Sequence, residues 1–257
     1  MNFGISTSCL YPMNTEDSLE LICKSGVKYC EVFLNTLSET TPEFAKKLKS
    51  IADFYGTKIV SVHPFTSFAE TFMLFSEYKR RFDDTLEFYK RSFEVASLTG
   101  ADISIIHGGL VPAKISHDEY FERFGMLIDA GKEFGVRVAP ENVNRHLSEN
   151  PEFLKEMRTA LGSDFKLVFD IKQSVRAGFD PIEFAKEFAK DIIHVHISDH
   201  DAENDCLPPS KGQFDFKKLF TLLEDAGYDS SFVIELYRHN FGKCEDLLNS
   251  LAFVQNL

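Results

Sequence analysis

Six side chains of the types that bind metal ions stand at the ends of successive apolar, β-branched runs in this chain of 257 residues. Neighbouring members are between 26 and 44 residues apart, which is the length of one strand plus one helix rather than of a local motif. They can meet only if the fold brings the ends of several strands to one rim. The six are His63, His107, Glu141, Asp170, His196 and Glu235.

The donor types favour a divalent metal ion. Histidine nitrogen suits Zn²⁺ and Mn²⁺, and carboxylate oxygen suits Mn²⁺ and Mg²⁺. The carboxylates of Glu141, Asp170 and Glu235 follow apolar runs, where they would be poorly solvated unless paired or coordinated. Residues two positions earlier should share their inward direction, and four of these six are apolar: Ile105, Ala139, Val168 and Val233. We therefore expect bound Zn²⁺ or Mn²⁺, with Mg²⁺ or Co²⁺ as alternatives.

The other histidines favour simpler interpretations. His194 lies one layer deeper than His196 in the same run, where a hydrogen-bonded core residue is commoner than a ligand. The remaining four fall in segments that we expect to be surface or loop: His117, His146, His200 and His239.

The elements that must position these residues alternate along the chain. Eight short runs have strand character: 3–7, 29–34, 58–63, 103–107, 137–141, 166–170, 192–197 and 232–236. Segments of helical length and period lie between and after them: 15–24, 42–55, 78–98, 118–134, 152–160, 181–189, 216–226 and 245–253. Thr41-Pro42 and Asp180-Pro181 predict helix starts, and glycines such as Gly56 and Gly100 predict helix ends. Eight such units predict a single (β/α)₈ TIM barrel over residues 1–257, whose loops 64–76 and 198–215 cover the C-terminal mouth.

Composition narrows the class of partner. Lys and Arg number 28 against 40 Asp and Glu, a formal net charge of −12 that disfavours nucleic acid and anionic membranes. Five cysteines without a C-x-x-C pair indicate reduced thiols, and the N-terminal residues resemble no signal peptide. We expect a cytoplasmic protein that acts on a small molecule. No segment identifies an interface, although barrels of this kind often form homodimers or homotetramers.

Several motifs together resemble the xylose isomerase-like TIM-barrel superfamily, which contains sugar and sugar-phosphate isomerases and epimerases and the zinc-dependent AP endonuclease branch. The resemblance spans the chain and is carried by His63, Ile106-His107-Gly108-Gly109, Pro140-Glu141-Asn142, Phe169-Asp170, His196-Ile-Ser-Asp199, Lys211-Gly212-Gln-Phe-Asp215-Phe216 and Ile234-Glu235. It implies a four-ligand metal site formed by Glu141, Asp170, His196 and Glu235. It also implies that His63 and His107, with Glu141, match a further metal position of the endonuclease branch.

The resemblance favours an isomerase or epimerase over a nuclease. A third nuclease metal requires a histidine three residues after the strand-six aspartate, where this chain has Gln173, and an Asp-x-His pair that loop 198–215 lacks at the expected place. A divalent ion can chelate neighbouring hydroxyl and carbonyl oxygens of a sugar and acidify the carbon between them. Glu141 and Glu235 would then move the proton through an enediolate. A hydrolase like the AP endonucleases, a polyol dehydratase and a non-catalytic metal-binding barrel remain alternatives.

Substrate contacts are expected from four further residues near the mouth: Gln173, Arg238, Lys211 and Phe65. Arg238 and Lys211 could neutralise a phosphate or carboxylate of a sugar derivative, or form exposed salt bridges. The loop after the third strand also carries Phe68, Phe72 and Phe75, which with Phe65 could form an aromatic lid or pack in the core. The sequence leaves open whether the substrate is phosphorylated.

Overall fold

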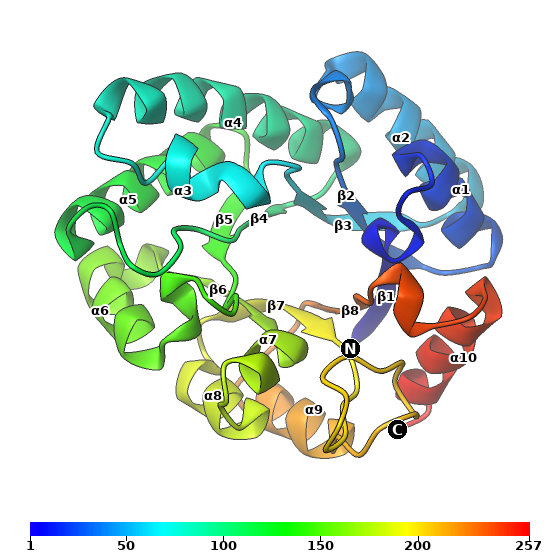
Figure 1. Ribbon diagram of the computed structural model, residues 1–257. Coiled ribbons are helices and arrows are strands. Elements are labelled where there is room, and N and C mark those ends of the chain that lie inside the picture. The colour runs from blue at the N-terminus through cyan, green and yellow to red at the C-terminus, as the bar shows by residue number, and fades with distance from the viewer.

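The computed structural model describes residues 1–257 and contains eight parallel strands. They are β1 (Asn2–Ser6), β2 (Tyr29–Phe33), β3 (Lys58–His63), β4 (Ile103–Ile106), β5 (Arg137–Pro140), β6 (Leu167–Asp170), β7 (Ile192–Ile197) and β8 (Ser231–Ile234). All eight predicted strands are present, with ends that differ by at most two residues. Figure 1 shows them at the centre of a ring of helices.

The helices form the outer layer of a (β/α)₈ TIM barrel, as predicted. They are α1 (Thr15–Lys24), α2 (Pro42–Tyr55), α3 (Glu70–Met73), α4 (Lys79–Thr99), α5 (His117–Glu133), α6 (Pro151–Leu161), α7 (Ile171–Arg176), α8 (Pro181–Phe188), α9 (Phe216–Asp225) and α10 (Cys244–Gln255). The short helices α3 and α7 were not predicted. No helix has the length and apolar character that crossing a membrane would require.

The predicted helix-capping residues are found at the ends of helices. The Thr41 hydroxyl accepts the backbone N–H of Phe44, and the Asp180 carboxylate accepts the N–H groups of Ile182 and Glu183, so both residues cap helices that begin with proline. Gly56 ends α2 in the left-handed conformation, with φ of 68°.

The sheet is continuous from β5 through β4, β3, β2, β1, β8 and β7 to β6. Its two ends meet at one parallel bridge between Glu141 and Val168, which closes the barrel. The Asn142 side chain reinforces this seam, since its amide donates to the Asp170 carbonyl at 3.0 Å and accepts the Asp170 N–H at 2.7 Å. The seam therefore depends on few backbone hydrogen bonds.

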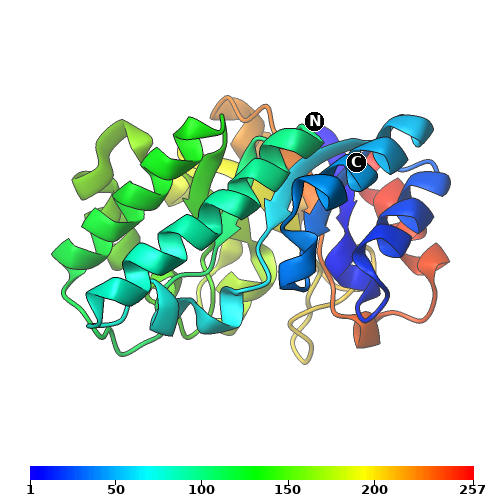
Figure 2. The same ribbon diagram turned by 90° about the horizontal axis from the view of Figure 1, so that it is seen from above.

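Apolar residues form two separate cores. The larger contains 58 buried residues and packs the helices against the outside of the strands. The smaller fills the barrel interior with Ile103, Ile105, Ala139, Val168 and Ile193. Its members include Ile105, Ala139 and Val168, which confirms that these strand positions point inward beneath the rim residues. In Figure 2 the loop 198–215, drawn in yellow, extends from the edge opposite the N-terminus.

Candidate metal centre

Four predicted ligands converge at the C-terminal mouth from neighbouring strands. Asp170 of β6 is the register partner of His196 of β7, so both side chains point to the same side of the sheet. Glu141 follows β5 across the seam, and Glu235 follows β8. The Nδ1 atom of His196 lies 3.5 Å from an oxygen of Glu141, 3.8 Å from Asp170 Oδ2 and 3.5 Å from Glu235 Oε2.

This donor set fits a divalent ion. Ligand atoms that bind one ion at about 2.1 Å lie about 3 to 3.5 Å apart in common geometries, close to the separations found here. His196 Nδ1 is a buried atom without a hydrogen-bond partner. Such an orphaned polar atom is costly unless another group satisfies it. The three carboxylates and one histidine nitrogen could therefore hold a metal.

His63 and His107 form a second cluster with Glu141. They lie near its Oε2 atom, whereas His196 lies near its Oε1 atom. His107 Nε2 lies 3.1 Å from Glu141 Oε2, and the Nε2 atoms of the two histidines are 2.9 Å apart. His63 Nδ1 lies 3.0 Å from the Pro64 carbonyl oxygen. Nδ1 therefore donates there, and the neutral ring keeps its Nε2 lone pair for the cluster. The geometry places both predicted histidines beside the quartet, and with Glu141 they form a second group of side chains that could hold an ion.

The charges of the cluster are tightly coupled. Burial favours a higher pKa for Glu141, but His107 and hydrogen bonds from three histidine rings hold that pKa well below its usual range. Burial raises the pKa of Asp170 to about 6, because attraction by Lys172 only partly offsets burial and the repulsion of Glu141 and Glu235. Burial lowers the pKa of His196, yet the carboxylates of Glu31 and Glu235 outweigh it and hold that pKa well above the ordinary value.

Lys172 belongs to the centre and was missed by sequence analysis. Its Nζ lies 2.9 Å from both Asp170 Oδ2 and Glu235 Oε2, its side chain is 3% exposed, and it lies over the ring of Tyr237. The lysine stands two residues after a predicted ligand, at the start of the unpredicted helix α7. Only the structure reveals that a turn of helix returns its ammonium group to the ligand oxygens.

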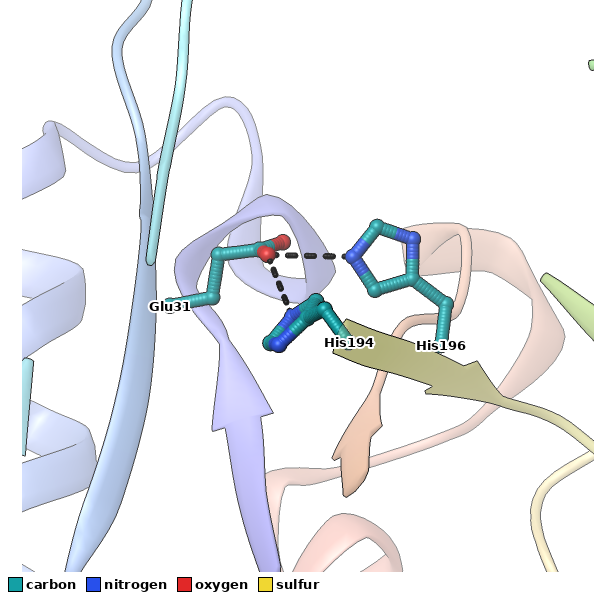
Figure 3. Close-up of side chains that lie close together, drawn as sticks. All are labelled: Glu31, His194 and His196. Carbon is teal, nitrogen blue, oxygen red and sulfur yellow. Dashed lines mark hydrogen bonds and ion pairs between the residues drawn. The ribbon is translucent and has the colours of Figure 1, made fainter. Parts of the chain in front are cut away.

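Glu31 is a second missed residue. It lies within β2, and its carboxylate meets the ring nitrogens of His194 and His196 inside the barrel, as Figure 3 shows. His194 is fully buried and hydrogen-bonded, as its interpretation as a core residue predicted. The available signal for Glu31 was its charge within the otherwise uncharged run 29–34.

A cavity of about 310 Å³ opens onto the centre. This volume lies at the lower end of the range for small-molecule sites. It is lined by Glu141, Glu235, His107, Lys172, Gln173, Ser8, Tyr11, Phe33, Asn35, Leu236 and Tyr237. Gln173 is thus placed as a substrate-contacting residue would be.

The other three residues expected to contact substrate do not line this cavity. The guanidinium of Arg238 donates to the carbonyl oxygens of Phe241 and Gly242, and Lys211 is exposed. Phe65 is half-buried and packs edge-on against Phe88.

The phenylalanines of the expected aromatic lid differ in burial. Phe75 is buried and stacks on Tyr120, whereas Phe68 and Phe72 are 79% and 57% exposed. Phe75 therefore contributes to the core, and none of the four phenylalanines after β3 borders the cavity.

Comparison with known proteins identifies the family. The family model described as xylose isomerase-like TIM barrel matches residues 19–257. The chain belongs to this family. An uncharacterized protein of Methanocaldococcus jannaschii is 26% identical over 249 residues, which cover 91% of this chain and 83% of that protein.

Solved structures of similar fold include several sugar epimerases. A D-tagatose 3-epimerase-like protein aligns with a TM-score of 0.82 at 22% identity, over 100% of this chain and 96% of its own. A D-psicose 3-epimerase studied in the presence of D-fructose gives 0.81 at 15% identity, over 100% and 99%. The IOLI protein with a bound zinc atom gives 0.73 at 19% identity, over 100% and 96%. At these identities the likeness establishes the shared xylose isomerase-like fold.

Proposed function

We propose that this protein is a divalent-metal-dependent enzyme that epimerises or isomerises a sugar or a related polyol by proton transfer. The observation that carries the proposal is that two carboxylates, Glu141 and Glu235, border the cavity while each contributes an oxygen near His196 Nδ1. We assign Glu141, Asp170, His196 and Glu235 as ligands, with His63 and His107 at a second position. Zn²⁺ and Mn²⁺ are the proposed ions, and the zinc-containing IOLI structure supports the former.

The chain's own groups suit proton transfer at a carbon beside a carbonyl. A bound divalent ion would supply electrostatic stabilisation of the negative charge that develops on neighbouring substrate oxygens. Glu141 is held ionised by His107, which fits it to remove a proton. Glu235 reaches the centre from β8, where the Ser8 hydroxyl donates to its Oε1 atom at 3.4 Å, and it would return to the substrate a proton that it has taken up from solvent. Transfer between two faces of one carbon gives epimerisation, and transfer between neighbouring carbons on one face gives isomerisation.

The surroundings of the centre favour a sugar over a nucleic acid. The related folds named above include enzymes that act on ketoses, and the cavity volume suits a monosaccharide. Gln173 stands at the position where the endonuclease branch requires a third-metal histidine, and its side-chain oxygen accepts the backbone N–H of Asn144. The net charge of −12 also opposes binding to a phosphodiester backbone.

The test combines metal analysis with proton exchange. The protein is purified without chelator, its metals are measured, and it is then incubated in heavy water with ketoses, polyols and phosphorylated sugars. We expect about one or two equivalents of Zn or Mn, with deuterium entering one carbon of a sugar. The Glu141→Gln, Glu235→Gln double variant should lose exchange by about 10³-fold or more even when metal is supplied. Glu224→Gln, an exposed change on α9, is the matched control and should exchange like the parent.

The outcomes separate the alternatives. Loss of water from a polyol without exchange in ketoses would indicate a dehydratase. Tightly bound metal with no reaction on any sugar would indicate a hydrolase or a non-catalytic barrel, and absence of metal from the purified protein and after loading would refute the assignment of the ligands.

A further inference from the structure

The Glu31 carboxylate is the central acceptor of a polar network inside the barrel. Its side chain is fully buried and belongs to β2, facing β7 (Figure 3). Its Oε1 accepts the Ser6 hydroxyl at 3.0 Å, and its Oε2 accepts the Ser61 hydroxyl at 2.7 Å. The Nε2 atoms of His194 and His196 each lie 3.0 Å from the same Oε2. Three strands, β1, β3 and β7, therefore direct four donors at one buried charge.

This network is not itself arranged to take an ion. A carboxylate offers about four lone-pair positions, and four donors already surround Glu31. Its residues are fully enclosed, and none of them lines the cavity at the mouth. A buried carboxylate is destabilising unless donors compensate it, so these four contacts offset the cost of burying the charge of Glu31 and hold its side chain in place.

The contact with His196 connects this network to the candidate metal centre. Because Nε2 of His196 donates to Glu31, Nδ1 carries the lone pair of the neutral ring. That Nδ1 atom has no hydrogen-bond partner and faces the oxygens of Glu141, Asp170 and Glu235. Glu31 thus meets one edge of the imidazole ring while the proposed ligands meet the other.

We propose that Glu31 is a positioning residue for the metal centre, which fixes the ring of His196 and directs Nδ1 to the ion. This inference rests on the metal site in the proposed function. Carboxylates behind ligating histidines fix the tautomer and ring orientation and increase the basicity of the ligand. Glu31 contacts neither the cavity nor the other three ligands, so its direct contact with the centre is through His196.

The test measures metal affinity, which does not depend on knowing the substrate. Competition with a chromophoric chelator gives the Kd for Zn²⁺ and Mn²⁺ of the parent, of Glu31→Gln and of Ser61→Ala. Glu31→Gln keeps the shape of the side chain but removes its charge, and we expect affinity to fall by about 10- to 100-fold. Ser61→Ala removes a donor to the same Oε2 atom but leaves the carboxylate on His196, so we expect a change of less than about threefold. Circular dichroism and thermal unfolding report whether both variants fold.

A second measurement uses the unaltered protein and covers the case in which Glu31→Gln does not fold. In the zinc-loaded parent, nitrogen-15 NMR of the histidine rings, assigned with His196→Gln, should show His196 protonated at Nε2 and bound through Nδ1. Binding through Nε2 would overturn the proposal, as would parental metal affinity in Glu31→Gln or an equal loss in Ser61→Ala. A parent that binds no metal would refute both this inference and the proposed function. Weakened metal binding in Glu31→Gln with no sugar exchange in the parent would support the inference and refute only the enzymatic assignment.

Discussion

The ammonium group of Lys172 shares its two partner oxygens with the proposed ion. Asp170 Oδ2 and Glu235 Oε2 lie 2.9 Å from Nζ and also face His196 Nδ1. Burial lowers the pKa of Lys172, but Asp170 and Glu235 outweigh it and keep that pKa well above its ordinary value. The lysine is therefore a cation that compensates buried carboxylates before a metal binds and repels the metal afterwards.

Replacing Lys172 should accordingly strengthen metal binding. In Lys172→Met the side chain stays unbranched but loses its terminal charged atom, and two unit charges about 4 Å apart interact by several kcal/mol even at an effective dielectric of about 20. We expect the Kd for Zn²⁺ or Mn²⁺ to fall at least tenfold in a chelator competition. The metal-free variant should also unfold at a lower temperature, because Asp170 and Glu235 lose their partner. Lys211→Met, at an exposed lysine, is the control, and weaker metal binding in Lys172→Met would show that the lysine assists the ion instead.

Residue types at strand ends were enough to predict which side chains converge at the mouth but not the groups behind them. His63, His107 and the quartet could be found because each ends a strand, and a barrel brings all strand ends to one rim. Glu31 lies mid-strand and Lys172 lies on a short helix, so neither position indicates a role. Their importance depends on distances of about 3 Å between elements far apart in sequence, and no sequence period encodes such distances.

Among the secondary-structure elements, the strands and long helices were predictable because each repeats its apolar pattern over several residues. Helix α3 has four residues, too few to show a helical period. Helix α7 starts directly at the end of β6, and the two carboxylate oxygens of Asp170 have different roles there. Its Oδ1 caps the helix through the N–H of Gln173, while its Oδ2 faces the metal centre. Because the helix follows the strand without an intervening loop, the sequence has no turn signal that would mark the boundary between β6 and α7.

The turn after β4 offers a test of how an element positions a ligand. Gly108 follows His107 with φ of 87°, and its N–H donates to the buried carboxylate of Glu70 at 2.5 Å. A methyl group at Gly108 would collide with the hydroxyl of Tyr120. Gly227 has the same φ of 87° but open space around it. An alanine at Gly227 would therefore show the cost of the backbone conformation alone, without a collision.

We expect Gly227→Ala to lower the free energy of unfolding by about 1–2 kcal/mol, the cost of a left-handed conformation. Gly108→Ala should lower the free energy of unfolding by at least about 1–3 kcal/mol more than Gly227→Ala does, because the collision displaces Tyr120 or the turn. Urea denaturation of both variants measures the difference. Equal losses would mean that Tyr120 moves aside freely and that the turn does not fix His107.

At the scale of the whole molecule, the candidate centre lies across a weak joint of the barrel. Strands β5 and β6 meet through one bridge and the side chain of Asn142, whereas most other neighbouring strands pair over at least three residues. Glu141 stands on one side of this joint and Asp170 on the other. An ion bound by both would connect the two ends of the sheet, and it would also neutralise carboxylates that repel one another in the metal-free barrel.

Metal binding should therefore stabilise the fold most strongly at that joint. A ligand present at 100 times its Kd stabilises the native state by about 2.7 kcal/mol, which corresponds to a rise in Tm of roughly 5–10 °C for a chain of this size. Calorimetry with and without chelator measures this rise. Amide hydrogen exchange locates it, and we expect the N–H groups of Glu141 and Asp170 to gain more protection than those in β2 and β3. Because global unfolding exposes every strand equally, a uniform gain in protection would show that the ion stabilises the barrel without acting on the seam.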